Sequence, residues 1–371
     1  MSLKDPVQAR GLLKEFANQP RQIVFGVDQA IDNTVLAFIT PIPRDSASGK
    51  EWAQAHVYML DLPGRGKTAI STCLSASVEA KLGRVDGRPD LMPSDLVGRE
   101  EADRGTGIRT LLKGPIHSNV FFMDEINRTP PKGQAVMLGA MEGGYVIMNV
   151  TDLQRRVVEA KSFPLHPISD DSSEKRMFFI VMATANPIEF EGTYPLSEAQ
   201  KERFTYSFRI GRPDREHEMM VRAGNVAGKK IKKVMNLSEL LDIQDMVKKV
   251  ELSGEAHELI MRYIENSMPQ SQDLEESERT RKRHATSDLI KFVDTYVANG
   301  CSVRRNFHME AAAKAWAFMR GENSTATAED VKAVAPITME HVILLQPGRA
   351  LANKITTKQV VQRIISETTM P

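Results

Sequence analysis

Three groups of polar residues, each following an apolar run, have the types and spacing needed to bind and hydrolyse a nucleoside triphosphate. The first is GRGKT at Gly64–Thr68, the second is the acidic pair Asp124-Glu125, and the third is Asn186. A glycine-rich loop with a lysine can hold phosphate groups, and a carboxylate pair can hold Mg²⁺ and activate water. An amide can orient that water, because it both donates and accepts hydrogen bonds.

The segment from Asp61 to Thr68 (DLPGRGKT) lies between a predicted strand, His56–Leu60, and a predicted helix, as a phosphate-binding loop does. Lys67 would contact the β- and γ-phosphates, and the Thr68 hydroxyl would ligate Mg²⁺. The usual pattern begins with glycine, whereas this chain has Asp61. That carboxylate would repel phosphates unless it points away or hydrogen-bonds the loop. Taken alone, GRGKT is also compatible with a chance match.

The acidic pair ends an apolar run, Val120–Met123, which is typical of a buried central strand. Open α/β sheets bind ligands at the carboxyl ends of their strands, where Asp124 would hold Mg²⁺ and Glu125 would polarise water as a general base. Asn186 follows a third apolar run, Met177–Ala183, and would hold that water in line. The purely structural alternatives are an acidic turn after a core strand for Asp124-Glu125, and a turn residue before a proline for Asn186.

These runs alternate with helical patterns, which predicts an α/β fold with a parallel sheet and helices on both faces. A basic linker, GKKIKKV at Gly228–Val234, separates this part from a region of helical periodicity. The predicted domains are 1–228, an α/β nucleotide-binding core, and 229–371, an all-α domain with a C-terminal tail. Residues 40–52 and 83–118 are interpreted as loop-rich, the latter with a small exposed hairpin or a disordered loop as alternatives.

Composition restricts the function further. The chain has 371 residues, of which 41% are hydrophobic and 26% charged. Its formal net charge is +1, so its overall electrostatic field does not favour binding to nucleic acid or to a membrane. We find no signal peptide and no apolar run long enough for a membrane helix. Cys73 and Cys301 lack metal-binding spacing and are expected to be free thiols in a reducing cytoplasm. The charge run at 275–284 is interpreted as a solvated loop.

At this point the sequence resembles the MoxR family of AAA+ ATPases, over roughly residues 20–345. The stretch EGTYPLSEAQ is specific to MoxR-like proteins among AAA+ proteins. The segments that carry the resemblance are DLMPSD (90–95), KGPIHSN (113–119), FMDEINRTPPKGQAVMLGAME (122–142), MATANPIEFEGTYPLSEAQKERF (182–204) and NGCSVRRN (299–306).

The resemblance implies a role for each matching residue. Asp124 and Glu125 form the Walker B motif, and Asn186 is sensor 1. Arg203 looks like the arginine finger that reaches a neighbouring subunit, although a cation at a helix end is also favoured by the helix dipole. The Walker A motif, with Lys67 and Thr68 at its centre, would contact the nucleotide through Pro63, Gly64, Arg65, Gly66, Lys67, Thr68 and Ala69.

Other positions follow from the same resemblance. Arg304 matches sensor 2, but Val303 replaces the family's proline and Arg305 follows, so either arginine could fill that role. Val24, Phe25 and Gly26 resemble the segment that lines the adenine pocket. Residues 92–118 match the family's helix-2 insert, and residues 145–160 match its pre-sensor hairpin. The implied fold is a P-loop AAA+ core followed by an all-α lid domain.

The implied function is that of an ATPase with ATP/ADP and Mg²⁺ as cofactors, acting as a homo-oligomeric ring of six subunits in the cytoplasm. MoxR-like proteins are thought to remodel or mature client proteins as chaperones, with a von Willebrand factor A (VWA) domain partner. Two alternatives stay open: a nucleotide-binding scaffold with weak hydrolysis, motivated by Asp61, and a DNA-associated AAA+ motor. The near-neutral charge argues against the second alternative.

Overall fold

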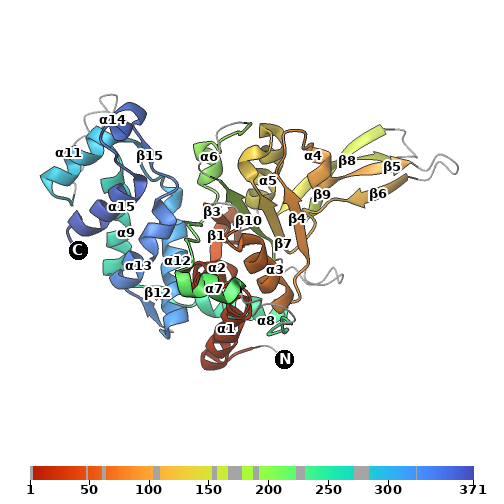
Figure 1. Ribbon diagram of the computed structural model, residues 1–371, viewed down its shortest axis with the longest axis horizontal. Coiled ribbons are helices and arrows are strands. Elements are labelled where there is room, and N and C mark those ends of the chain that lie inside the picture. The colour runs from red at the N-terminus through yellow and green to blue at the C-terminus, as the bar shows by residue number, and fades with distance from the viewer. Residues whose placement is uncertain are drawn as a thin grey trace. The chain divides into compact units, whose positions relative to one another are not determined.

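The computed structural model describes residues 3–46, 49–60, 64–102, 109–152, 157–165, 178–186, 192–222, 230–270, 284–322 and 324–371. The chain forms two compact units. The first comprises Met1–Ile39, Ala53–Leu196 and Phe208–Ile243, and the second comprises Thr40–Trp52, Ser197–Ser207 and Gln244–Pro371. Figure 1 shows the first unit around the sheet strands and the second as a group of helices.

A five-stranded sheet has the order β11-β3-β10-β7-β4, and its strands β3, β10, β7 and β4 belong to the first unit. Its pairings β3–β10, β10–β7 and β7–β4 are all parallel. The central strands are buried along almost their whole length, as a parallel sheet covered by helices requires. This confirms the predicted α/β class. The strands are β3 (Val57–Leu60), β4 (Leu82–Asp86), β7 (Val120–Asp124), β10 (Ile180–Ala185) and β11 (Tyr206–Phe208).

Strand β4 corrects the interpretation of residues 83–118 as loop-rich, because Leu82–Asp86 pairs along its length with β7. Its sequence, LGRVD, contains a glycine and two charged residues, which weakens any strand signal. The glycine is required by close packing: a Cβ on Gly83 would lie 1.9 Å from the carbonyl oxygen of Pro115. As the last strand in the order, β4 can also tolerate polar side chains.

Helices α1 (Pro6–Arg21), α2 (Asp28–Ile39) and α3 (Lys67–Ser77) pack around the sheet, with α1 against α2 and α3, and α3 against β4 and β7. The helical pattern predicted from Ala9 to Phe16 is confirmed, and both of these side chains are fully buried. The unit also contains α4 (Pro93–Val97), the 3₁₀ turn η1 (Ile126–Arg128), α5 (Pro131–Gly143) and α7 (Arg215–Arg222). Helix α8 (Leu237–Lys248) contains the division between the two units.

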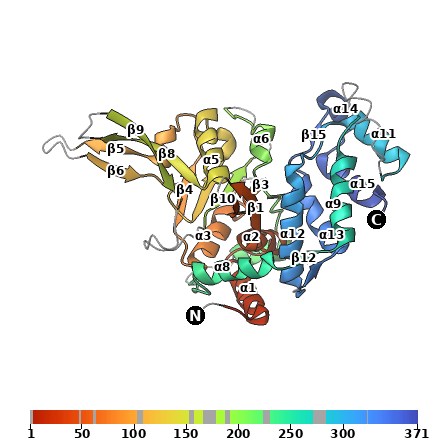
Figure 2. The same cartoon turned by 180° about the vertical axis from the view of Figure 1, so that it is seen from behind.

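Two antiparallel hairpins lie side by side in the first unit (Figures 1 and 2). They are β5 (Gly98–Ala102) with β6 (Arg109–Lys113), and β8 (Tyr145–Asp152) with β9 (Val157–Pro164). The Glu100 carboxylate accepts hydrogen bonds from the Thr151 hydroxyl, at 2.7 Å, and from the Thr151 backbone N–H. These bonds, together with Arg109, lower the pKa of Glu100. The hairpin tips at 103–108 and 153–156 lie outside the described residues.

His56, the residue before β3, gives the first unit a pH-sensitive contact. Its Nδ1 accepts a hydrogen bond from the Val181 N–H at 3.0 Å, and its Nε2 lies 3.3 Å from the Met141 carbonyl oxygen. This pattern requires the neutral tautomer with a proton on Nε2. Burial lowers the pKa of His56 to about 4. A protonated ring would bring a second N–H against the Val181 N–H.

Because the folded-state pKa lies below the unfolded value, His56 stabilises the fold at neutral pH and this stability is lost as the pH falls from about 6.5 toward 4. The loss corresponds to about 3 kcal/mol. We expect urea unfolding to show a smaller pH dependence in His56→Gln, whose amide can make the same two bonds. The exposed His257 supplies the control variant His257→Gln. A pH dependence unchanged by His56→Gln would contradict the assignment.

The second unit is mostly helical. Helix α13 packs against α9, α12 and α15, and a hairpin of β1 and β2 joins the unit through contacts of β1 with α12. Its helices are α6 (Glu198–Lys201), α9 (Gly254–Ser267), α11 (Ser287–Tyr296), α12 (Arg304–Arg320), α13 (Ala328–Met339), α14 (Pro347–Ala352) and α15 (Thr357–Glu367). Its strands form the pairs β1 (Pro41–Ser46) with β2 (Gly49–Gln54), β12 (Glu251–Leu252) with β14 (Thr325–Ala326), and β13 (Val297–Asn299) with β15 (Leu344–Leu345).

One sequence interpretation is wrong in this unit. Residues 40–52 are interpreted as a loop, whereas residues 41–46 and 49–54 form the strands of the β1–β2 hairpin, and Pro41 is tolerated because it is the first residue of its strand. Near the C-terminus the chain forms α14 and α15. Thr356 and Gln359 form a capping box at the start of α15, which buries Val360 and Ile364.

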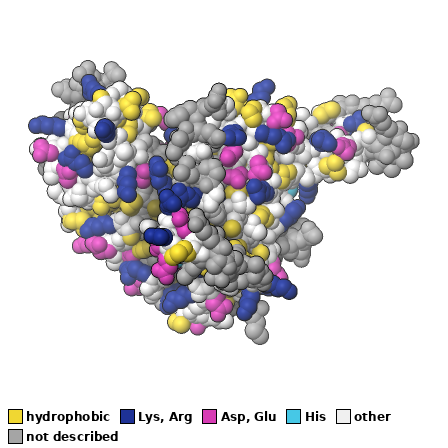
Figure 3. Space-filling model, in the orientation of Figure 1, with side chains coloured by type: hydrophobic (Ala, Val, Ile, Leu, Met, Phe, Trp, Pro, Cys, Tyr) yellow, Lys and Arg dark blue, Asp and Glu magenta, His cyan; other side chains and the backbone are white. Residues whose placement is uncertain are grey.

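The surface of the chain carries charges of both signs. On the face that Figure 3 shows, basic and acidic side chains intermingle. Among the helices in the described ranges, none combines the length and apolar character needed to cross a membrane. Cys73 and Cys301 are both buried and free, as predicted, and burial raises the pKa of each thiol to about 11.

Candidate nucleotide-binding site

The described end of the loop between β3 and α3, residues 64–66, leads directly into α3. Gly64 and Gly66 adopt left-handed conformations, with φ of 79° and 82°. Gly66 caps α3, so Lys67 and Thr68 are the first two residues of that helix. Lys67 is buried, with 7% of its surface exposed. Successive N–H groups at such a turn and at the start of a helix attract anions. Asp61 and Pro63 lie outside the described residues.

The segment that resembles an adenine-pocket lining, Val24–Gly26, packs against this loop. A Cβ added to Gly66 would lie 2.5 Å from Cγ1 of Val24, so only glycine allows this contact. On its other side, Gly26 has a left-handed φ of 71°, and a Cβ there would lie 3.1 Å from the ring of His217 in α7. The phosphate loop, the Val24–Gly26 segment and α7 are therefore neighbours within the first unit.

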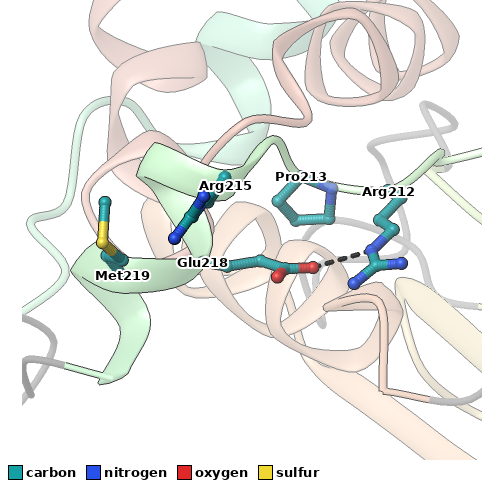
Figure 4. A pocket seen from close by; sticks show the side chains of 5 residues that line it. All are labelled: Arg212, Pro213, Arg215, Glu218 and Met219. Carbon is teal, nitrogen blue, oxygen red and sulfur yellow. Dashed lines mark hydrogen bonds and ion pairs between the residues drawn. The ribbon is translucent and has the colours of Figure 1, made fainter.

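A pocket of about 430 Å³ lies along α7 and the turn before it, lined by Arg212, Pro213, Arg215, Glu218 and Met219. In Figure 4 the Glu218 carboxylate extends toward Arg212, whose Nε lies 2.7 Å from Glu218 Oε1. The phosphate loop reaches the same turn, because Arg65 Nη1 donates a hydrogen bond to the Gly211 carbonyl oxygen at 3.1 Å. The sequence reasoning did not identify this pocket.

Asp124, at the end of β7, is held in place by residues of the two neighbouring strands, β10 and β4. Its carboxylate accepts a hydrogen bond from the Thr184 hydroxyl at 2.5 Å, and Arg84 Nη2 lies 3.6 Å from its second oxygen. The parallel register brings these residues together, because Ala183 pairs with Met123 and Arg84 pairs with Phe122. The carboxylate thus has a fixed orientation at the carboxyl end of the sheet.

Glu125 follows in an unusual backbone conformation, with φ of 50°. Its N–H donates to the Thr184 hydroxyl oxygen at 2.9 Å, and its carboxylate lies 3.2 Å from Arg128 Nε. Its side chain is partly exposed. Asn186 follows the neighbouring strand β10, so Glu125 and Asn186 follow the carboxyl ends of adjacent parallel strands. The backbone therefore places the acidic pair and Asn186 at the same end of the sheet.

Thr184 is a residue that the sequence reasoning passed over, although it links Asp124 to Glu125. It is fully buried, and Thr184→Val would leave the Asp124 carboxylate without a donor and the Glu125 N–H without an acceptor. We expect a loss of about 1–3 kcal/mol in the free energy of unfolding. We also expect a higher Mg²⁺ concentration for half-maximal ATP turnover, because Asp124 loses its orientation.

The matched control for this prediction is Thr184→Ser, which keeps the hydroxyl. Urea unfolding and a Mg²⁺ titration of turnover would measure both effects. A valine variant as stable and as sensitive to Mg²⁺ as the serine variant would show that the Thr184 hydroxyl does not orient Asp124.

The three candidate arginines belong to the second compact unit. Arg203 follows α6, is partly exposed, and donates from Nη1 to the Ala199 carbonyl oxygen at 2.6 Å. Arg304 is the first residue of α12 and is exposed. Arg305 is fully buried and bonded to residues 202–205. Of the two adjacent arginines, only Arg304 therefore presents its side chain to solvent.

The residues present fit a nucleotide with Mg²⁺. The loop offers backbone N–H groups, a buried lysine and the Thr68 hydroxyl, and the sheet edge offers the oriented Asp124 carboxylate. Within the part of the chain that the structure describes, no cluster of three or more His, Cys, Asp or Glu could hold a metal by itself. One hydroxyl and one carboxylate match Mg²⁺, which is usually held by few protein oxygens and completed by phosphates and water.

Comparison with known proteins gives the same picture. The model of the ATPase family associated with various cellular activities (AAA) matches residues 56–165 and 157–206, and the AAA lid domain model matches residues 291–364. YeaC of Bacillus subtilis is 30% identical over 322 residues, covering 86% of each chain. Chaperone MoxR1 of Mycobacterium tuberculosis is 27% identical, covering 95% of this chain and 80% of that one.

A solved structure agrees in fold over nearly the whole chain. It is the crystal structure of a protein assigned as an ATPase, from Cytophaga hutchinsonii, with a TM-score of 0.78 and 25% sequence identity. The alignment covers 99% of this chain and 97% of that one. Sequence motifs, family models and fold therefore agree, and the chain belongs to the MoxR-type AAA+ ATPases.

Proposed function

We propose that this chain hydrolyses ATP at the carboxyl edge of its parallel sheet, with Mg²⁺ as cofactor, and uses the energy to remodel a client protein. One observation carries the proposal. The hydroxyl of Thr184, in the strand that leads to Asn186, donates a hydrogen bond to the Asp124 carboxylate and accepts one from the Glu125 backbone N–H. A structural acidic turn would not require this orientation. Hydrolysis by a fixed ion site, a base and a water-positioning amide does require it.

Each residue has a proposed role. Lys67 and the N–H groups from Gly64 to Ala69 bind the phosphates, while Val24, Phe25 and Gly26 flank the base. Thr68 and Asp124 hold Mg²⁺, which would neutralise charge that develops on the phosphates. Glu125 takes the proton from the attacking water, and Asn186 orients that water. The roles proposed for single residues come from the resemblance and from this geometry.

We further propose that the active site is completed by a neighbouring subunit. Arg203 would act as an arginine finger on the neighbour's nucleotide, and Arg304 would serve as sensor 2. This arrangement requires a homo-oligomeric ring, for which six subunits is the family expectation. Support comes from exposure, because Arg203 is partly exposed and Arg304 is exposed on the second compact unit.

The mechanical output is proposed from the relatives. One of them is named chaperone MoxR1, which supports an action on other proteins rather than on DNA. A VWA-domain partner would deliver the client protein to the ATPase or couple it to the ATPase. We place this activity in the cytoplasm, where the two free buried cysteines stay reduced.

Native mass spectrometry of Glu125→Gln with and without ATP and Mg²⁺ tests the assembly. We expect a hexamer that retains intact ATP when ATP and Mg²⁺ are present, because the variant binds ATP but does not hydrolyse it. A monomer that binds ATP without assembling would contradict the ring and would favour a nucleotide-binding scaffold instead.

A further inference from the structure

Arg305 is a fully buried arginine, and its guanidinium group holds the segment that contains Arg203. Its Nη1 donates to the Phe204 carbonyl oxygen at 3.0 Å. Its Nη2 donates to the Glu202 carbonyl oxygen at 3.2 Å and to the Glu202 carboxylate at 2.9 Å. The bonded carbonyl groups thus lie on both sides of Arg203 along the chain.

The same short segment is held from two further places in the second unit. The backbone N–H of Ser302, just before α12, lies 3.4 Å from Glu202 Oε1, and His341 Nε2 lies 2.9 Å from the Phe204 carbonyl oxygen. Burial, and then the charge of Arg305, lower the pKa of His341 well below its usual value. A neutral His341 can donate from Nε2 to this carbonyl group, so the contact persists at neutral pH.

These contacts are more extensive than charge compensation would need. A buried arginine requires a carboxylate partner, which Glu202 supplies with a side chain that is 16% exposed. The two Nη groups instead divide between carbonyl groups on either side of Arg203, and this uses the planar fork of the guanidinium. A point charge such as a lysine ammonium could satisfy Glu202 but could not hold both carbonyl groups in this geometry.

We propose that Arg305 is a positioning residue that fixes Arg203 to the start of α12, so that the arginine offered to the neighbouring subunit moves together with the helical unit of its own subunit. This inference rests on the proposed function, because it needs Arg203 to act in catalysis. Arg305 itself is buried and contacts no nucleotide in this proposal. Its effect on turnover would pass entirely through the 202–204 backbone.

The matched variant is Arg305→Lys, which keeps the positive charge beside Glu202 and loses the fork. A misplacement of about 1 Å can reduce a rate by about 10²-fold. We therefore expect kcat to fall by roughly 10- to 100-fold, while KM for ATP and the Kd of ATP stay within about twofold. Adding Glu202→Gln to Arg305→Lys removes the negative charge beside the lysine. It should not restore kcat, because the lost bonds to the carbonyl groups are not replaced.

Hydrogen exchange supplies a readout that a general loss of stability would not reproduce. In Arg305→Lys, amides of residues 198–207 should exchange faster, whereas amides of α13 and of β7 should keep their protection. Faster exchange throughout the second unit, with a lowered Tm, would show a purely structural role and overturn the proposal. An unchanged kcat, or a raised KM with unchanged kcat, would also overturn it.

Mixed oligomers separate this inference from the proposed function. Arg203→Ala subunits keep their own hydrolytic residues, and Glu125→Gln subunits can lend them Arg203. We expect this mixture to recover activity, and we expect much less recovery when the lender carries both Glu125→Gln and Arg305→Lys. Equal recovery with both lenders would refute the positioning role. If neither mixture recovers activity while Arg305→Lys alone shows the kinetic and exchange changes, the transfer of Arg203 to a neighbour is unsupported and the positioning of Arg203 by Arg305 stands.

Discussion

Replacing Glu125 with glutamine is expected to reduce ATP turnover by about 10²- to 10⁴-fold, the range found for general acid–base residues. ATP binding should stay close to wild type, because the amide has the same shape and no phosphate contact is assigned to Glu125. The backbone of Glu125 is held by the Thr184 hydroxyl, and glutamine leaves that bond unchanged. The measurements are steady-state turnover and equilibrium binding of a fluorescent ATP analogue.

A matched control for this prediction is Glu329→Gln. Glu329 is an exposed glutamate of α13 paired with Lys332, and its side chain is 77% exposed. This control should leave turnover unchanged. Turnover of Glu125→Gln close to that of the control would show that another group activates the water.

Replacing Arg203 with alanine is expected to lower kcat by about 10³- to 10⁵-fold, the effect of an arginine finger on phosphoryl transfer. The fold should survive, since Arg203 is partly exposed and the 202–204 backbone keeps its bonds to Arg305 and His341. ATP binding at the same subunit's loop should also survive. Circular dichroism and nucleotide titration would check both conditions.

Mixing Arg203→Ala with Glu125→Gln subunits should recover part of the activity, because each variant damages a different half of a shared site. Activity of Arg203→Ala near wild type would contradict the finger and leave Arg203 as a helix-end cation. Arg203→Lys is the comparison that isolates guanidinium geometry from charge.

The α/β core could be predicted because its inner strands are continuous apolar runs that end in polar residues. The same signal was absent from β4, where Gly83 is required by the nearby Pro115 carbonyl group and charged residues occupy the last strand in the sheet order. Local patterns could likewise not reveal the β1–β2 hairpin, whose first residue is a proline. Pairing with the distant strand β7 decides β4, whereas β1 and β2 pair with each other.

The candidate site was predicted only in part, for a related reason. Thr184, Arg84 and Arg128 contact the acidic pair, yet each is an ordinary residue in the sequence. Only the parallel register places Thr184 of β10 on one side of Asp124 and Arg84 of β4 on the other. A Ser or Thr one position before the end of the neighbouring strand would have been the available signal.

Arg304 and Arg305 show a second limit of sequence reasoning. Two adjacent arginines have the same type, and the motif alone left both as candidates for sensor 2. The start of α12 turns the first toward solvent and the second into the unit, where it meets the 202–205 backbone. The rotation between successive helical residues therefore separates their environments.

Specific ATPase activity measured against protein concentration, for the wild-type chain and for Glu125→Gln, tests the central claim most directly. A site completed by a neighbouring subunit predicts activity per subunit that rises with concentration as the ring assembles, and no such rise in the variant. Wild-type activity per subunit that is independent of concentration in a protein shown to be monomeric would contradict the shared site.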